Sequence, residues 1–211
     1  MPKGSKELTK ARKDEIVNAC AELYDKMPYK EITPGKISEL TSFTRTSIYN
    51  YFKTREEIFL ALLQREYEEW TRALTALAES KSALDADGFA REIAHSLSCR
   101  GRMFKLLSVN IYEIEAESRE ENLVLFKRAY GAAIEALRAC LRRFFPALEK
   151  TDEEVFIYAF LPFLFGVYPY AHATQKQISA MQKAGVEVPS LSEFSLVSDF
   201  LKALLDGLLK K

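Results

Sequence analysis

Apolar residues recur along almost the whole chain at intervals of three and four positions, the spacing of one face of an α-helix. The first run contains Ile16, Cys20 and Leu23 and ends before Pro28. Alternating, strand-like runs are missing, and the 211 residues include only 8 glycines and 7 prolines. The pattern predicts an all-α protein of about nine helices without a sheet.

The predicted helices differ in length on the two sides of residue 54. Short apolar runs at Ile37–Leu40 and Ile48–Phe52 precede a long run from Ile58 to Leu77. We therefore predict a compact three-helix domain over residues 1–53 and a larger helical bundle over residues 54–211. The helix that starts at Thr54 should join the two without a flexible linker.

Several helix ends carry local signals. Asp85 or Asp87 is a suitable N-cap for the helix that follows it. Thr151 precedes three acidic residues, so we predict a capped start there and a helix that runs to about Lys183. The last helix should begin near Ser190 or Ser192.

One stretch, Val155–Ala173, has no charged residue apart from a protonatable histidine, and its length approaches the ~20 residues that span a membrane. Pro162, Gly166 and Pro169 interrupt it. We therefore interpret it as a helix buried in the protein core or in a subunit interface, and we expect no membrane association.

Charge narrows the choice of partners. Lysine plus arginine and aspartate plus glutamate both number 30, so a nucleic-acid site requires a local concentration of positive charge. Such a concentration occurs in the first thirteen residues, where five basic residues accompany one acidic residue, Glu7; the five are Lys3, Lys6, Lys10, Arg12 and Lys13. An ordinary solvated terminus is the alternative interpretation.

The segment Leu40–Ile58, LTSFTRTSIYNYFKTREEI, combines hydroxyl, aromatic and basic side chains. Thr33 is a suitable cap for a short helix that starts at Pro34, the segment TSFT forms a turn, and Thr44 caps a second short helix. Two short helices joined by such a turn are typical of a helix-turn-helix. In this motif the N-terminal end of the second helix enters the DNA major groove, where arginine, threonine and serine can contact bases or phosphates.

From about Ala11 to Leu63 the chain resembles the TetR family of bacterial transcriptional regulators, on the motifs IVNACAEL, YKEITPGKISEL and TRTSIYNYFKTREEIFLALL. The resemblance implies a sequence-specific, DNA-binding, cytoplasmic homodimer, and most simply a repressor that a small apolar or amphipathic ligand releases from a palindromic operator. It also assigns DNA contacts to nine positions: Thr33, Lys36, Thr44, Arg45, Thr46, Ser47, Tyr49, Asn50 and Arg55.

The chain departs from the family at Ser42, where glycine is usual. A left-handed residue there would cost about 1 kcal/mol without glycine. Either Ser42 tolerates this conformation, in which case glycine would raise stability slightly, or the turn differs.

The resemblance further implies that the last two helices of each subunit form a four-helix dimer interface, here residues 155–173 and the final helix. The bundle would hold the effector, and its nine candidate lining residues are Trp70, Leu74, Phe104, Leu107, Tyr112, Phe126, Tyr130, Phe163 and Tyr168. Ordinary core packing is the alternative interpretation of each of them.

Enzymatic chemistry has little support in the sequence. The three cysteines are scattered and the two histidines lie near no nucleophile or zinc motif, so we expect no enzyme, no metal and no cofactor. The remaining alternative is a helical ligand-binding or adaptor protein without DNA binding. The polar face from Arg45 to Arg55 argues against that alternative, because a protein that had lost DNA binding would not need it.

Overall fold

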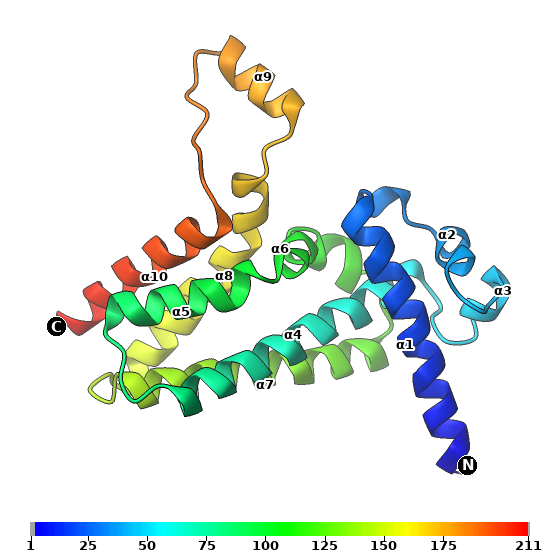
Figure 1. Cartoon of the computed structure of the whole chain (residues 1–211), viewed down its shortest axis with the longest axis horizontal. Helices are drawn as coiled ribbons and strands as arrows, with labels where there is room; N and C mark the ends of the chain where they lie inside the picture. The colour runs from blue at the N-terminus through cyan, green and yellow to red at the C-terminus, as the bar shows by residue number, and fades with distance from the viewer. Residues whose placement is uncertain (1–2, 211) are drawn as a thin grey trace. The chain divides into compact units, whose positions relative to one another are not determined.

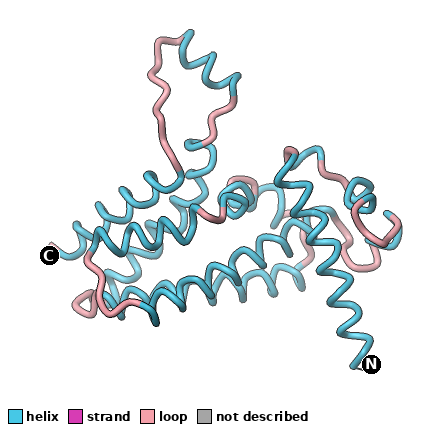
Figure 2. The backbone as a smooth tube through the Cα atoms, viewed as in Figure 1, coloured by secondary structure: helices cyan, strands magenta, loops and turns pink. Residues whose placement is uncertain are grey.

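The structure is a computed structural model that describes residues 3–210, with side chains from Lys6 onward. Helices and loops account for all of these residues, and no strand occurs among them (Figure 2). The predicted all-α class is confirmed. The described residues form ten α-helices, one 3₁₀-helix and one π-helix, in the order α1 (Lys3–Lys26), η1 (Tyr29–Glu31), α2 (Pro34–Glu39), α3 (Arg45–Ile48), α4 (Arg55–Ser80), α5 (Ala86–Ser98), α6 (Gly101–Leu107), η2 (Asn110–Glu115), α7 (Glu120–Phe144), α8 (Lys150–Ala171), α9 (Gln175–Lys183) and α10 (Glu193–Leu209) (Figure 1).

Two compact units form along the chain, and they differ from the predicted domains. Unit 1 comprises Met1–Glu66 and Val109–Ala129, and unit 2 comprises Tyr67–Ser108 and Tyr130–Lys211. The predicted three-helix domain therefore shares its unit with the first part of α4, with η2 and with the start of α7. Periodicity could not reveal this grouping, because residues 109–129 are distant in sequence from the helices with which they cluster.

Unit 1 is organised around the second half of α1. Ile16 and Cys20 are fully buried, as are Ile37 of α2 and Ile48 of α3. The Tyr24 ring meets the Phe59 ring edge-on, with 5.3 Å between the ring centroids. The short helices α2 and α3 thus present one apolar residue each to a core that α1 and α4 provide.

Unit 2 contains a layered bundle in which α10 packs against α5 and α8, and α6 packs against α8. Aromatic rings fill its centre: the Phe89 ring packs edge-on against those of Phe144, Phe145 and Phe156. Asp85 is the N-cap of α5 and accepts a hydrogen bond from the backbone N–H of Gly88, as predicted. Ser192 caps α10 in the same manner.

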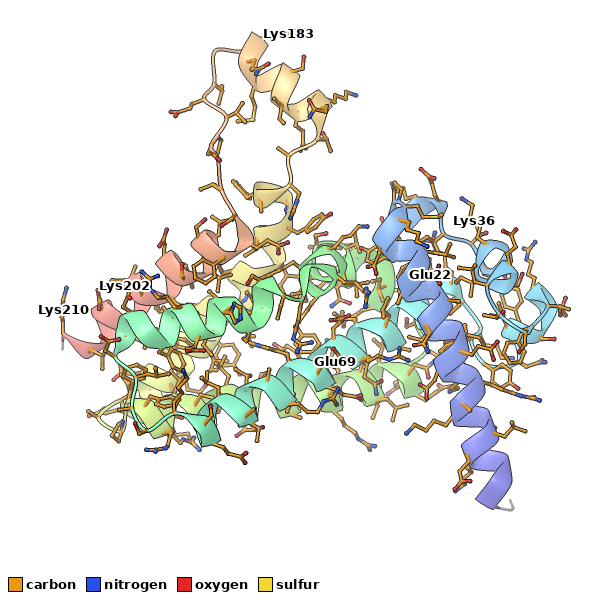
Figure 3. The ribbon with its side chains drawn as sticks, in the orientation of Figure 1. Glu22, Lys36, Glu69, Lys183, Lys202 and Lys210 are labelled. Carbon is orange, nitrogen blue, oxygen red and sulfur yellow. The ribbon has the colours of Figure 1, made fainter. Side chains whose placement is uncertain are left out.

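The helix predicted from Thr151 to Lys183 is wrong in two respects. It begins at Lys150 with Glu149 as N-cap, so Thr151 lies inside the helix. It also ends at Ala171, and a separate helix, α9, follows on an excursion that projects from α8 and α10, with Lys183 at its end (Figures 1 and 3). A complete capping box between Thr174 and Gln177 starts this new helix.

By length and composition alone, α8 could cross a membrane, and it is the one helix of residues 3–210 that meets this criterion. A core helix of a soluble protein meets the same criterion. Phe156, Phe160 and Leu164 of α8 are buried within unit 2, which is the packing expected of a core helix.

Candidate DNA-binding surface

The first helix of the predicted motif starts as its sequence indicates. Thr33 has extended backbone angles and its hydroxyl accepts a hydrogen bond from the backbone N–H of Lys36, at 3.2 Å. Pro34 occupies the first helical position, where a missing N–H costs no hydrogen bond. Lys36 lies on this helix with its side chain drawn in Figure 3. The cap fixes where α2 begins and which face carries Ile37 into the core.

The second helix of the motif, α3, is one turn long. Thr44 caps it by accepting a hydrogen bond from the N–H of Ser47, at 3.2 Å, and the two hydroxyl oxygens lie 3.0 Å apart. Backbone hydrogen bonds from Tyr51 and Phe52 to the carbonyl of Ile48 continue the winding as turns. The predicted helix over residues 45–52 is therefore a regular α-helix only to Ile48. Residues 49–52 continue the same winding as hydrogen-bonded turns.

The turn between the two helices does not use a left-handed residue at Ser42. No non-glycine residue of the described chain has a positive φ. Instead, the backbone N–H of Ser42 donates a hydrogen bond of 2.6 Å to a carboxylate oxygen of Glu15 on α1. Of the two alternatives, the different turn is correct. Because Ser42 is not strained, glycine at this position should not raise the stability.

The surface of α3 that faces away from Ile48 is polar. Of the predicted DNA-contacting residues in and beside α2 and α3, five are exposed and three are half-buried; the exposed ones are Thr33, Thr44, Arg45, Thr46 and Asn50, and the half-buried ones are Lys36, Ser47 and Tyr49. With Ile48 fixed in the core, this polar face is the one that α2 and α3 can offer to a partner.

Arg55, the ninth residue for which the resemblance implied a DNA contact, is held by contacts within unit 1. Its guanidinium lies 4.4 Å from the centre of the Tyr29 ring and donates to Glu56, at 2.7 Å from Nη2. Only 21% of its side chain is exposed. Burial and the charge of Glu56 raise the pKa of Tyr29 to about 12. Arg55 therefore holds η1 and α4 together, and its contact with DNA stays a prediction.

Sequence reasoning missed Glu57, a buried acidic residue of α4 with several hydrogen-bond partners. Its carboxylate is buried and accepts hydrogen bonds from the backbone N–H of Lys53, at 2.6 Å, and from Nε and Nη2 of Arg119. Burial alone would raise the pKa of Glu57, but the Arg119 guanidinium and the backbone donors lower it below its ordinary value. The hydroxyl of Thr54 adds a hydrogen bond of 3.1 Å to the carbonyl of Glu117.

This cluster joins two parts of unit 1. Lys53 ends the helix-turn-helix, whereas Glu117 and Arg119 directly precede α7. An acidic residue in the first turn of a helix usually signals only a favourable interaction with the helix dipole. The sequence offered no signal for a partner sixty residues away.

The candidate ligand-lining residues divide between the two units. In unit 2, Trp70, Leu74, Phe104 and Leu107 are buried, and Tyr130 packs edge-on against Tyr67. The indole N–H of Trp70 donates to the Ser96 hydroxyl, at 3.1 Å. These contacts are those of a packed core, and the role of these residues in ligand binding stays a prediction.

Two further candidates of unit 2 lie at helix surfaces. Phe163 stacks flat on Phe200, with 4.0 Å between ring centroids, and Tyr168 stacks on His172 at 4.4 Å. In unit 1, Phe126 is buried, whereas Tyr112 on the π-helix is 90% exposed. Tyr112 is therefore open to solvent in this structure, and its contact with a ligand stays a prediction.

An all-α chain with a capped helix-turn-helix and an exposed polar second helix has the architecture of a DNA-binding regulator. Residues 64–211 match the family described as "Tetracyclin repressor-like, C-terminal domain". The chain therefore belongs to the TetR family of transcriptional regulators, and the alternative of an adaptor protein outside this class is set aside.

Two regulators are similar to this chain in sequence. QacR of Staphylococcus aureus is 36% identical over 58 residues, which cover 28% of this chain and 31% of QacR. The match thus spans less than a third of that protein. YfiR of Bacillus subtilis, an HTH-type regulator, is 25% identical over 144 residues, which cover 67% of this chain and 69% of YfiR.

Solved structures share the fold at low sequence identity. The fatty acid degradation regulator FadR of Bacillus halodurans matches with a TM-score of 0.58 at 15% identity, over 92% of this chain and 94% of FadR. A TetR-family regulator of Mesorhizobium loti matches with a TM-score of 0.57 at 13% identity, over 96% of each chain. RolR in complex with resorcinol matches with a TM-score of 0.52 at 15% identity, over 94% of this chain and 95% of RolR.

Proposed function

We propose that this protein is a cytoplasmic, homodimeric repressor that binds a palindromic operator and releases it when a small apolar or amphipathic molecule binds the C-terminal domain. The observation that carries the proposal is the exposed polar face of α3, anchored from behind by Ile48. Exposed Arg45, Thr46 and Asn50 supply side chains suited to reading base edges. Thr33, Lys36, Thr44, Ser47 and Tyr49 supply donors for the flanking phosphates.

A dimer is required because one short helix reads too few base pairs, whereas two helices about 34 Å apart read successive turns of the major groove. The surface of α8 supports an apolar dimer interface. Val155 and Tyr158 are exposed to 49% and 63%, and Tyr170 to 71%. Gly166 of α8 and Gly207 of α10 have no heavy atom within 4 Å of the position of a side chain, so a partner helix could approach both closely.

The chemical class of the effector is inferred from related proteins and from the apolar character of unit 2. FadR is described as a regulator of fatty acid degradation and RolR was solved with resorcinol, so related folds serve apolar or amphipathic ligands. For release, the ligand must bind the conformation that does not fit DNA more tightly than the one that does, and DNA must weaken ligand binding by the same factor. The candidate lining residues remain those of the bundle.

The test is selection of bound fragments from a random DNA pool by the purified protein, followed by a screen of small molecules for release. We expect an inverted repeat whose half-sites are about 10 base pairs apart, centre to centre. Arg45→Ala should weaken binding to the selected sequence by about 1–3 kcal/mol and relax one position of each half-site. Arg91→Ala, which changes an exposed arginine of α5 paired with Asp87, is the matched control and should bind normally.

Failure to enrich any sequence at low ionic strength would contradict the proposal. Equal weakening of Arg45→Ala on all sequences would move Arg45 from base reading to phosphate contact. Enrichment of a site without internal symmetry would contradict the dimeric operator.

A further inference from the structure

The first turns of α1 carry a basic stripe, which we define as Lys6, Lys10 and Lys13. Spacings of four and three residues place these side chains on one face of the helix. Lys6 and Lys10 are exposed, and Lys13 is half-buried. In Figure 1 this part of α1 extends past α2 and α3 within unit 1.

Among the described residues, Lys6 and Lys10, unlike Lys13, have no contact that ties them to the rest of unit 1. Within the described part of the chain, neither Lys6 nor Lys10 takes part in an ion pair or a side-chain hydrogen bond, and the first turn of α1 contains no acidic residue. Lys6 lies in the first turn of α1, where the positive end of the helix dipole makes a positive charge unfavourable. Buried residues begin only at Ile16. The exposed positive charges of Lys6 and Lys10 are therefore available to a negatively charged partner.

Contacts on the opposite face of α1 fix the position of the stripe relative to α3. Nη1 of Arg12 donates to the Tyr51 hydroxyl, at 2.8 Å, and Glu15 accepts from the Ser42 backbone. These residues and Phe43 line a groove of about 520 Å³ between α1 and the helix-turn-helix. The helix therefore cannot rotate about its axis without breaking these hydrogen bonds.

One residue of the stripe also contacts the end of the helix-turn-helix. The ammonium group of Lys13 lies 5.5 Å from the centre of the Phe52 ring, and the next residue, Lys53, is exposed. The positive charge of α1 is thus adjacent to the segment that carries the DNA-contacting residues.

We propose that the basic stripe binds the DNA backbone outside the base pairs that α3 reads, and so extends the contact with the duplex. Lys6 and Lys13 are seven residues apart, which corresponds to about 10 Å along a helix. Phosphates of one strand follow at about 3.4 Å along the DNA axis, so this span covers about four successive phosphates, enough for one phosphate per lysine. This inference rests on DNA binding through α3 and adds a second, sequence-independent contact.

The experiment compares the wild type with K6Q/K10Q/K13Q on the operator fragment that the wild type selects. Each contacted phosphate contributes about 0.9 to the slope of log affinity against log salt. We expect the slope of the variant to be smaller by about 2.7. Between 50 and 200 mM salt, the wild type should lose about 40-fold more affinity than the variant. Sequence preference should be unchanged, since no base contact is removed.

Two further comparisons isolate the stripe. K6Q/K10Q spares Lys13 and its contact with Phe52, and should lower the slope by about 1.8. Glutamine and lysine have similar helix propensity, so both variants should retain the helical signal of the wild type, and K6Q/K10Q should also retain its melting temperature. K176Q/K183Q, on exposed positions of α9, removes equal charge from unit 2 and should leave the slope unchanged.

Trimming the flanking base pairs from the operator should weaken the wild type more than K6Q/K10Q/K13Q. Equal slopes and equal sensitivity to trimming in wild type and variant would overturn the proposal while leaving binding through α3 intact. A wild type that bound no duplex at all would overturn both the stripe and the proposed function.

Discussion

The buried carboxylate of Glu57 gives the sharpest test of the structure, through the substitution Glu57→Gln. The wild-type carboxylate accepts from the Lys53 backbone and from the Arg119 guanidinium, and Glu57 is only 1% exposed. Glutamine preserves the shape but removes the charge, and one carboxylate oxygen becomes an NH₂ group that cannot accept a hydrogen bond. The backbone N–H of Lys53 or the guanidinium of Arg119, both hydrogen-bond donors, then faces the NH₂ group, which is also a donor.

The magnitude follows from the kind of bond that is lost. A hydrogen bond to a charged group contributes about 1.5–3 kcal/mol, and an unsatisfied buried partner adds to the loss. We therefore expect Glu57→Gln to lower the free energy of unfolding by about 2–3 kcal/mol. For a chain of this length, that corresponds to a fall in melting temperature of about 5–10 °C. Calorimetry or circular dichroism at pH 7 measures it directly.

The dependence on pH supplies a second readout. The pKa of Glu57 lies below its ordinary value of 4.5 in the folded protein, so the unfolded state binds the proton more readily. The stabilisation is therefore fully present above about pH 4.5 and is lost as the pH falls through the folded pKa. Because Glu57→Gln has no such group, the difference in stability between wild type and variant should shrink as the solution is acidified below that value.

Glu22→Gln is the matched control. Glu22 also lies in a helix and pairs with a basic residue, Lys26, but its side chain is 54% exposed. An exposed pair of this kind contributes little, so the free energy of unfolding should change by less than about 0.5 kcal/mol. Should Glu57→Gln melt within a degree or so of the wild type at pH 7, or differ by an amount that ignores pH, the assigned network would be wrong.

Three other substitutions address the DNA-binding surface and the dimer. Tyr49→Phe should weaken binding modestly on every sequence, because it removes one donor suited to a phosphate; an unchanged titration would exclude the hydroxyl from the interface. Ser42→Gly should lower the melting temperature slightly through added freedom of the unfolded chain, since φ at Ser42 is not positive; a rise would restore the strained turn. Tyr158→Glu should convert the dimer to a monomer in ultracentrifugation and abolish operator binding, because it places a charge in the proposed apolar interface; a dimer that persists would move the interface elsewhere.

The parts of the fold that local chemistry decides could be predicted from the sequence. A threonine cap followed by proline fixed the start of α2, and Thr44 with Ser47 fixed the start of α3, because both rely on residues within one turn of each other. The end of α8 was missed although its signals were local. The predicted helix followed the apolar run through Tyr168, and the capping box at Thr174 was not recognised as a new start. The predicted helix was therefore too long.

Other features depend on tertiary contacts and could not be derived from spacing. The π-helix at Asn110–Glu115 and the exposure of Tyr112 that follows from it have no signature in the apolar periodicity. The bond between Glu15 and the turn at Ser42 replaces a glycine that the family uses. At Ser42 the backbone conformation is held by a group on another helix, 27 residues away in sequence.

The adjacent residues Arg55, Glu56 and Glu57 show why the missing information is physical and not a matter of better pattern rules. In sequence, all three look like the solvated first turn of a helix. In the structure, Arg55 stacks on Tyr29 and binds Glu56, whereas Glu57 turns into the protein and binds Arg119. A buried carboxylate remains charged only while its donors stay in place. Any rearrangement that withdrew Arg119 would therefore also weaken the hold of the same carboxylate on the Lys53 backbone, at the end of the helix-turn-helix.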